Sequence, residues 1–240
     1  MIIIFSYHSV STKNYLYSVS PKNFTKQLNY LLDKNFKIIS ASKLYEILKS
    51  GYIPKDNLAV ITFDDGLEDN YLQAFPILKK LKAPAVIFLP TDYIGRGVDD
   101  SNSFTFLNWE QIFEMDQNGL VKFGGHTKSH KILTELDESD IKKEIFEAKE
   151  ILENKLNKKI EFFAYPKGKF NNSVKNIVGQ KFKLAFGKDG IIFDFKNLDF
   201  LALPRITISA ETSFWRFRLF FSPTFWKFYL LLKRIIKYYV

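Results

Sequence analysis

Two adjacent carboxylates follow an apolar stretch and precede a glycine, in Thr62-Phe63-Asp64-Asp65-Gly66. At the end of a strand, the glycine permits a tight turn that exposes both side chains. Neighbouring carboxylates can then do different work, one binding a metal while the other acts as a base. The alternative interpretation is an ordinary turn, because Asp and Gly are typical of loops that begin after a strand.

Two of the three histidines lie four residues apart, at His126 and His130, directly after another apolar run. Imidazoles at this spacing can converge on one ion. With one aspartate they form a set of two histidines and one carboxylate that leaves coordination positions for water and substrate. The chain has no cysteine, which excludes disulfides, iron–sulfur clusters, thiolate zinc sites and cysteine nucleophiles. Two unrelated surface histidines are the alternative.

The third histidine, His8, and a Pro/Gly turn at residues 163–168 also follow apolar runs. A buried, hydrogen-bonded histidine is the ordinary interpretation of His8, and its place after a strand favours a functional one. The turn either reverses the chain or presents backbone N–H groups to a developing oxyanion.

Alternating elements place these residues at one edge of a sheet. Apolar β-rich runs predict strands at residues 2–6, 58–63, 85–89, 121–123, 160–164, 184–186 and 201–203. Apolar residues at helical spacing predict helices at residues 24–32, 44–48, 71–78 and 139–156, the last with a solvated, charge-rich outer face. Such alternation indicates an α/β fold with a mainly parallel sheet, open or closed into a barrel. In barrels of this kind, active sites lie at the carboxyl ends of the strands.

The three motifs, in this order, resemble the polysaccharide deacetylases of carbohydrate esterase family 4, the NodB-homology domain. The motifs span residues 62–168, and His8 and Arg205 extend the resemblance to most of the body. The resemblance implies a distorted (β/α) barrel of the NodB-homology type. It also implies a hydrolase that removes N-acetyl, sometimes O-acetyl, groups from sugars with a divalent metal.

Carried over residue by residue, the resemblance makes Asp65, His126 and His130 the metal ligands and Asp64 the general base. Zinc is the expected metal, with cobalt, nickel, iron or manganese as alternatives. The backbone N–H of Lys167 would help the metal to hold the oxyanion. Two neighbours in the same turn, Tyr165 and Pro166, are assigned to substrate binding.

Two departures from the family pattern shift roles to other residues. Ala164 occupies the position of the family's motif arginine, and Arg205 is the candidate substitute that orients the base. No histidine follows His130, so the usual late general acid is absent. The chain resembles instead the branch of poly-N-acetylglucosamine deacetylases, in which an early Tyr-His pair supplies the acid, and this assigns the role to His8.

The positive charge is concentrated in the C-terminal segment. The formal net charge is +9, and residues 212–240 contribute six bases and no acids. We therefore divide the chain into a deacetylase-like barrel at residues 1–210 and an amphipathic basic and aromatic tail at 211–240. Within the tail, Ser222 and Pro223 favour the start of a C-terminal helix. Its composition is typical of a helix at an anionic membrane surface, and packing on the barrel or on a partner is the alternative.

The remaining expectations concern location and substrate. The N-terminal residues carry no basic region and no small-residue cleavage site, which predicts a cytoplasmic protein, peripheral at the inner face of the membrane. The predicted partner is an acetylated amino-sugar glycan or a lipid-linked sugar precursor. Nucleic acid is not expected, because the body has no basic stripe. Residues 92–107 are expected to form a loop that shapes specificity. The alternatives are a catalytically silent carbohydrate-binding barrel and a related amidohydrolase for a small non-sugar amide.

Overall fold

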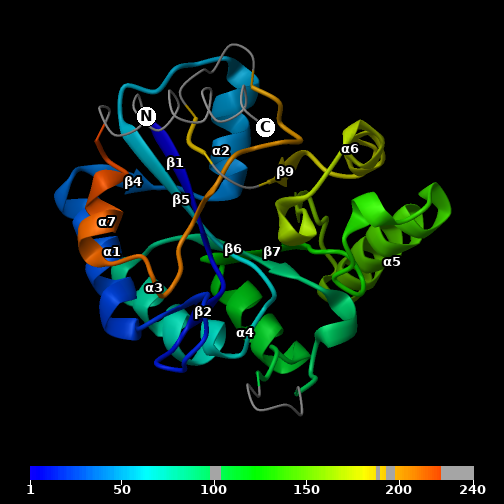
Figure 1. The fold of residues 1–240 in the computed structure, drawn as a ribbon, viewed down its shortest axis with the longest axis horizontal. Helices are drawn as coiled ribbons and strands as arrows, with labels where there is room; N and C mark the ends of the chain where they lie inside the picture. Colours follow the sequence, from blue (N-terminus) through cyan, green and yellow to red (C-terminus); the bar gives the residue numbers. More distant parts are fainter. Residues whose placement is uncertain (98–103, 188–189, 193–197, 223–240) are drawn as a thin grey trace, which may run out of the picture.

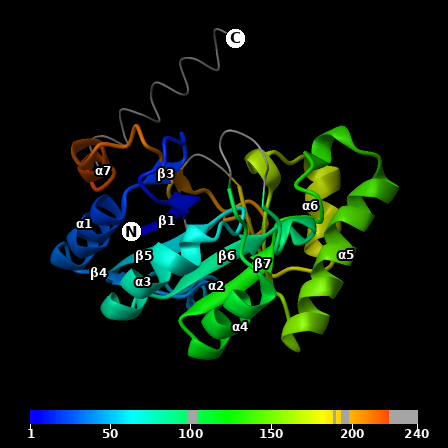
Figure 2. The same cartoon turned by 90° about the horizontal axis from the view of Figure 1, so that it is seen from below.

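A curved parallel sheet forms the centre of the molecule, and helices lie around its outside (Figures 1 and 2). The computed structural model describes residues 1–97, 104–187, 190–192 and 198–222. The strands of the main sheet are β1 (Ile2–Tyr7), β4 (Phe36–Ile38), β5 (Asn57–Phe63), β6 (Ala85–Leu89), β7 (Val121–Gly125), β8 (Phe162–Ala164), β9 (Leu184–Phe186) and β10 (Ile206–Thr207). A second, small sheet pairs β2 (Ser9–Val10) with β3 (Ser18–Val19).

The strand order is β10-β1-β5-β6-β7-β8-β9, with β4 added beside β5. One segment touches both ends of this series: Leu203 forms a parallel bridge with Phe186 of β9, and three residues later Ile206 pairs with Phe5 of β1. The sheet is thereby curled toward a barrel, which confirms the predicted α/β fold class. The predicted strand at residues 201–203 is wrong, because only Leu203 of this segment forms a bridge. The strand of this part of the chain is β10, which begins three residues later.

The helices are α1 (Pro21–Asp33), α2 (Ala41–Ser50), α3 (Phe75–Leu81), α4 (Trp109–Asn118), α5 (Glu138–Leu156), α6 (Asn172–Gly179) and α7 (Phe214–Leu219). The predicted helix at 71–78 is divided, because Asn70–Ala74 forms a π-helical turn before α3. Pro76 has no N–H to offer the carbonyl of Leu72 four residues earlier, and this favours the local change of hydrogen-bond register.

Polar residues on two buried helix faces are departures from the predicted patterns. On α1, Leu32 is 40% exposed, and its expected place in the core is taken by Gln27, which accepts a hydrogen bond from the Tyr7 hydroxyl at 3.0 Å. On α5, the predicted stripe is confirmed, but Glu144 is buried within it. The carboxylate of Glu144 and the Oε1 atom of Gln27 have specific partners, which offsets part of the cost of removing these side chains from water, whereas Gln27 Nε2 has no partner among the described residues.

Both faces of the sheet are buried. Along β1, Ile3, Phe5 and Tyr7 belong to one hydrophobic cluster, and Ile2 and Ile4 belong to a second cluster that includes α2. Side chains alternate between the two faces of a strand, so a strand covered on both sides is apolar throughout. This explains why the strands of the sequence appear as continuous apolar runs rather than alternating ones.

The first part of the predicted tail packs on the barrel. Phe217 of α7 is fully buried, its ring stacks on Phe5 with centroids 5.3 Å apart, and α7 lies beside α1 (Figure 2). The helix expected from Ser222 and Pro223 onward lies outside the described residues, and the domain boundary at residue 210 stays a prediction. None of the helices described is long and apolar enough to cross a membrane.

Candidate active site

Four strands deliver the candidate residues to one edge of the sheet. His8 follows β1, Asp64 and Asp65 follow β5, His126 follows β7, and Lys167 follows β8. The register of β1 and β5 pairs Tyr7 with Phe63, so the residues after each strand begin side by side. Because all the strands are parallel, their carboxyl ends meet, and these residues line a single pocket.

Asp65, His126 and His130 form the arrangement expected for a metal site. An Oδ1 atom of Asp65 lies 3.5 Å from His126 Nε2 and 3.3 Å from His130 Nε2, and one ligand atom from each residue lies within 4.8 Å of the others. His126 Nδ1 is 2.7 Å from the carbonyl oxygen of Ala164. That bond fixes the proton on Nδ1 and leaves Nε2 as the electron-pair donor, the support that metal-binding histidines usually have. The donor set fits a divalent ion such as zinc.

The backbone is strained where these residues lie. Asp65, Thr127, His130 and Lys167 have φ angles of 69°, 64°, 59° and 57°. This left-handed region is unfavourable for side chains with a Cβ, most of all for a β-branched threonine. The other described non-glycine residues in this region follow helix ends: Asn35, Lys82 and Asn157. Strain concentrated at one pocket is typical of a functional site.

Glu144 of α5 holds the loop that carries both histidines. Its Oε2 accepts hydrogen bonds from the backbone N–H groups of Lys128 and Ser129 at 3.0 and 2.8 Å, and its Oε1 accepts one from Ser129 Oγ at 2.5 Å. Within the same loop, the N–H of His130 donates to Thr127 Oγ1 at 2.9 Å. The loop is therefore fixed by a buried carboxylate, which stabilises the strained conformation.

Arg205 forms a buried, two-pronged ion pair with Asp64. Its two terminal nitrogens each donate to a different oxygen of Asp64 at 2.7 Å. Its Nε donates to the carbonyl of Gly187 at 3.0 Å, and Nη1 also donates to Thr62 Oγ1. Burial alone would raise the pKa of Asp64, but the positive charge of Arg205 outweighs it and holds the pKa below the usual value. Asp64 is therefore ionised at neutral pH, and Arg205 fixes the orientation of its carboxylate. Arg205 is the residue that the sequence analysis named as the candidate for this contact.

His8 lies on the other side of Asp64, with its Nε2 4.0 Å from Asp64 Oδ2. Its ring stacks on Tyr17 at 4.7 Å, and its carbonyl accepts a hydrogen bond from Asn70 Nδ2 at 2.7 Å. Burial lowers the pKa of His8, more than the nearby carboxylates raise it. Its Nδ1 is buried without a hydrogen-bond partner among the described residues. A proton on the cationic form is therefore held weakly and is easily released.

The third motif supplies backbone and not side chains. Lys167 and Gly168 line the pocket, and the N–H of Lys167 has no acceptor in the part of the chain that the structure describes. Tyr165 is fully buried and donates its hydroxyl to the carbonyl of Leu201 at 2.8 Å. Pro166 is also buried. The assignment of Tyr165 and Pro166 to substrate binding is corrected on this ground, since their side chains belong to the core.

Several pocket residues gave no motif in the sequence. Tyr15 and Tyr17, from the loop between β2 and β3, form part of the pocket wall, and no short pattern marks a lone tyrosine. Glu144 did leave a signal. It lies on the apolar stripe of α5, between Ile141 and Ala148, and a carboxylate in that place requires a buried partner.

Comparisons with known proteins agree with this geometry. A family model described as polysaccharide deacetylase matches residues 52–181. The putative polysaccharide deacetylase YxkH of Bacillus subtilis (strain 168) is 31% identical over 168 residues, which cover 70% of this chain and 57% of that protein. The poly-beta-1,6-N-acetyl-D-glucosamine N-deacetylase of Staphylococcus aureus (strain N315) is 29% identical over 220 residues, which cover 87% of this chain and 73% of that protein.

A solved structure shows the same fold. The Streptococcus pyogenes deacetylase PplD, in complex with acetate, superposes with a TM-score of 0.79 and 27% sequence identity. The match covers 92% of this chain and 98% of that one. The likeness in fold therefore extends over most of both chains.

Proposed function

The chain belongs to the polysaccharide deacetylase family, and on that premise we propose that it is a metal-dependent hydrolase that removes N-acetyl groups from amino-sugar residues of a glycan. The observation that carries the proposal is the convergence of Asp65, His126 and His130 beside a separate, ionised Asp64. A site that only bound sugar would not need a fixed carboxylate next to a metal-binding set.

The reaction is hydrolysis of an amide: water adds to the acetyl carbonyl, the C–N bond breaks, and acetate and an amine are released. A divalent ion held by Asp65, His126 and His130 would supply Lewis acidity toward water and the carbonyl. Asp64, kept ionised by Arg205, would accept the proton of the attacking water. Arg205 makes Asp64 a weaker base than a free carboxylate, and in exchange it fixes the oxygen atoms in position.

The N–H of Lys167, a residue that lines the pocket, would donate to the developing oxyanion. His8, within 4.0 Å of Asp64, would protonate the leaving nitrogen. Its lowered pKa suits this role, because the cationic form is a stronger acid than an ordinary imidazolium.

The test uses the zinc- or cobalt-loaded protein with N-acetylglucosamine oligomers, and measures free amine and acetate in equal amounts. Asp64→Asn should retain the metal by elemental analysis and lose turnover by about 100-fold or more. A loaded wild-type protein that binds the oligomers without releasing acetate would support the carbohydrate-binding alternative. Release of acetate from small non-sugar amides alone would support the amidohydrolase.

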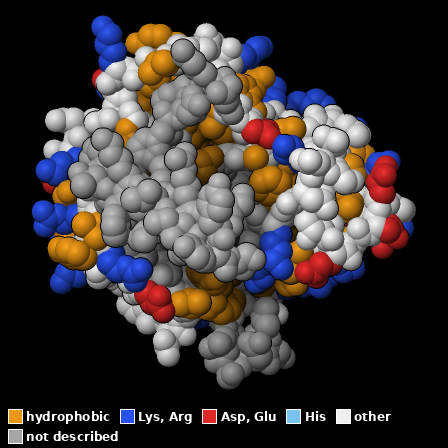
Figure 3. All heavy atoms as spheres, turned by 45° about the horizontal axis from the view of Figure 1, so that its top comes forward, with side chains coloured by type: hydrophobic (Ala, Val, Ile, Leu, Met, Phe, Trp, Pro, Cys, Tyr) orange, Lys and Arg blue, Asp and Glu red, His pale blue; other side chains and the backbone are white. Residues whose placement is uncertain are grey.

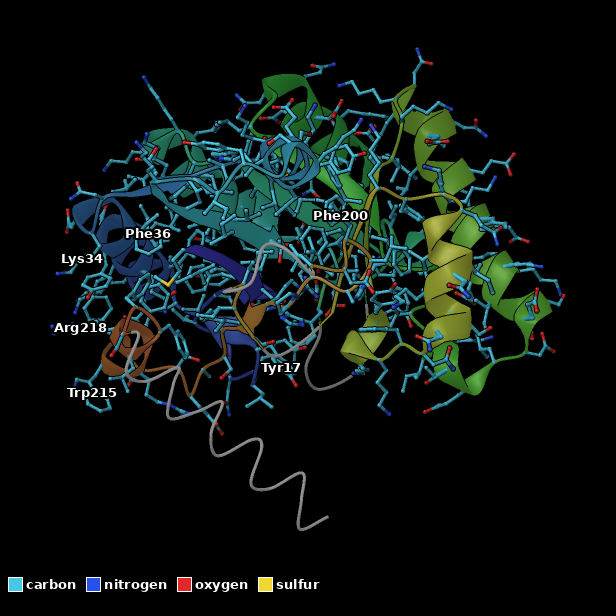
Figure 4. All side chains as sticks on the ribbon, turned by 90° about the horizontal axis from the view of Figure 1, so that it is seen from above. Tyr17, Lys34, Phe36, Phe200, Trp215 and Arg218 are labelled. Carbon is cyan, nitrogen blue, oxygen red and sulfur yellow. The ribbon has the colours of Figure 1, made fainter. Side chains whose placement is uncertain are left out.

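We further propose that the corner formed by α1 and α7 contacts an anionic membrane, which would bring the site to lipid-linked or surface glycans. Trp215 is 66% exposed there, and Figure 4 shows it at the same outer corner as Lys34 and Arg218. On the face drawn in Figure 3, the described Lys and Arg side chains lie in separate groups among hydrophobic, uncharged and a few acidic ones. Exposed tryptophan beside cations is typical of an interfacial surface.

Co-sedimentation with vesicles tests this surface. Vesicles containing phosphatidylserine should bind the protein more tightly than neutral vesicles, and salt should weaken the binding. Trp215→Ser with Arg218→Glu should reduce the bound fraction, whereas Tyr52→Ser, another exposed aromatic at 58%, should not. If the Trp215→Ser, Arg218→Glu protein and the Tyr52→Ser protein bind the vesicles equally well, the α1/α7 corner is not the membrane-binding surface. The cytoplasmic location stays a prediction.

A further inference from the structure

An aromatic row leads out of the candidate active site. The ring of His8 stacks on Tyr17 at 4.7 Å, Tyr17 contacts Tyr15 edge-on at 5.7 Å, and Tyr15 contacts Phe104 at 4.5 Å. Tyr15 and Tyr17 line the pocket that holds the metal-binding set, and Phe104 lines a neighbouring hollow. The row therefore connects the two spaces.

Backbone hydrogen bonds hold the outer end of this row. The N–H of Glu68 donates to the carbonyl of Thr105 at 2.8 Å, and the N–H of Leu107 donates to the carbonyl of Gly66 at 2.8 Å. Phe104 is thereby tied to the segment directly after Asp65. On the other side, the N–H of Ala210 donates to the carbonyl of Leu16 at 2.8 Å, which fixes the loop that carries both tyrosines.

The hollow beyond Phe104 has the chemistry of a sugar site. It is open to solvent, and its lining includes the polar side chains of Ser11, Thr12, Glu68 and Gln73. A pyranose ring has an apolar C–H face and a rim of hydroxyl groups. Aromatic rings contact the first and polar side chains hydrogen-bond the second, the usual division of work in a ligand pocket.

Tyr15 has a hydroxyl available for such a ligand. No described residue forms a hydrogen bond with it, and it lies close enough to Asp65 for their charges to interact. A phenol hydroxyl is protonated at neutral pH and can therefore donate to a ligand.

We propose that Tyr15 and Phe104 form a second sugar subsite, which holds the amino-sugar ring next to the one that loses its acetyl group. This inference rests on the proposed function and deepens it, because it names the two side chains of this chain that would hold the neighbouring ring. Binding energy from the neighbouring ring is then available to position the acetyl group over Asp64.

The test compares β-1,6-linked N-acetylglucosamine oligomers of one and three units. In the wild type, kcat/KM should rise about 10-fold or more from monomer to trimer. Phe104→Ala and Tyr15→Ala should reduce the trimer-to-monomer ratio toward one, mainly through KM. Tyr15→Phe, which keeps the ring, should retain most of the ratio. Tyr52→Ala, an exposed aromatic at the opposite edge of the sheet, should leave it unchanged.

A binding measurement separates this inference from the proposed function. Trimer is titrated calorimetrically into the Asp64→Asn protein with and without Phe104→Ala. If no variant releases acetate but Phe104→Ala weakens trimer binding about 10-fold, the subsite stands and the hydrolase proposal fails. If the wild type releases acetate equally well from monomer and trimer, or both aromatic variants keep the ratio of the wild type, the subsite is overturned.

Discussion

Arg205 donates hydrogen bonds to both carboxylate oxygens of Asp64 at 2.7 Å, although the two residues are 141 positions apart in the chain. The guanidinium is also flanked by the rings of Phe88 and Phe186, at 5.6 and 5.9 Å from their centroids. A charge buried in this way is stable only with its partner present. The pair therefore joins the last part of the barrel to the edge of β5, and it fixes the candidate base.

Removing one partner of this pair should cost more than removing both. Arg205→Met should lower the free energy of unfolding by about 3–5 kcal/mol, because Asp64 is left charged and buried. The double variant Asp64→Asn with Arg205→Met should be more stable than Arg205→Met alone. Unfolding in guanidinium chloride of the wild type, Asp64→Asn, Arg205→Met and the double variant gives the coupling free energy between the two residues. If the changes in the free energy of unfolding of the two single variants add up to that of the double variant, Arg205 and Asp64 do not stabilise each other.

The geometry of the pair should matter as well as its charge. Arg205→Lys keeps the positive charge, but a single ammonium cannot form two parallel hydrogen bonds with one carboxylate. We expect kcat to fall about 100-fold while the protein stays folded, because the base is no longer held in its productive orientation. Steady-state kinetics alongside circular dichroism checks this. A kcat equal to that of the wild type would show that charge alone is sufficient.

Glu144 should control metal affinity without contacting the metal. Glu144→Ala leaves the backbone N–H groups of Lys128 and Ser129 without their acceptor, so the loop bearing His126 and His130 loosens. Zinc affinity, measured by competition with a chelator, should fall about 10- to 100-fold, with Glu144→Gln intermediate. Glu147→Gln is the matched control, since Glu147 lies on the same helix and, among the described residues, its carboxylate pairs with the Lys128 side chain alone, at 2.7 Å. Equal affinities for the Glu144 and Glu147 variants would exclude a role for the buried carboxylate.

Metal binding should stabilise the fold. The candidate ligands Asp65, His126 and His130 come from two separate strand ends, so an ion that joined them would bind the folded state alone. At a free zinc concentration 100 times Kd, the gain is about 2.7 kcal/mol, visible as a higher thermal midpoint. Chelator should abolish this gain together with acetate release. His130→Ala should show neither effect, and a midpoint that still rises with zinc in that variant would place the ion elsewhere.

Glu153 on α5 should make stability depend on pH in the acid range. Its Oε1 accepts the backbone N–H of Ile160 at 2.9 Å and lies 2.9 Å from Lys149 Nζ. Burial would raise its pKa, but these contacts outweigh it and lower the pKa below the ordinary value of 4.5. The stabilisation is therefore present above that value and is lost as the pH falls through the folded-state pKa.

The measurement compares Glu153→Gln with the wild type across pH 3–8. At neutral pH the variant should be less stable by under about 1 kcal/mol, since the pair is partly exposed. The difference should shrink as the pH is lowered. Glu150→Gln, on the exposed side of the same helix, should show no such trend. A constant difference across the range would mean that the hydrogen bond, and not the charge, is responsible.

The sequence alone indicated the α/β fold class and the side chains from which the candidate metal site is built, and the family resemblance chose Asp65 among them. Continuous apolar runs followed by Asp64-Asp65-Gly66 and by Gly125-His126 favoured buried strands with polar residues at one edge of a sheet. This information is local, because periodicity, turn residues and ligand types are all contained within short windows of the chain. The spacing of His126 and His130 is also local information, and it predicted that the two rings lie close together.

Only the tertiary structure decided which residues hold that set in place and which face the pocket. The buried position of Tyr165, the carboxylate of Glu144 beneath the histidine loop, and the row from His8 to Phe104 depend on contacts between segments far apart in the chain. Packing and hydrogen bonding across the fold choose among side chains that are equivalent by type, and no short window of sequence contains those partners.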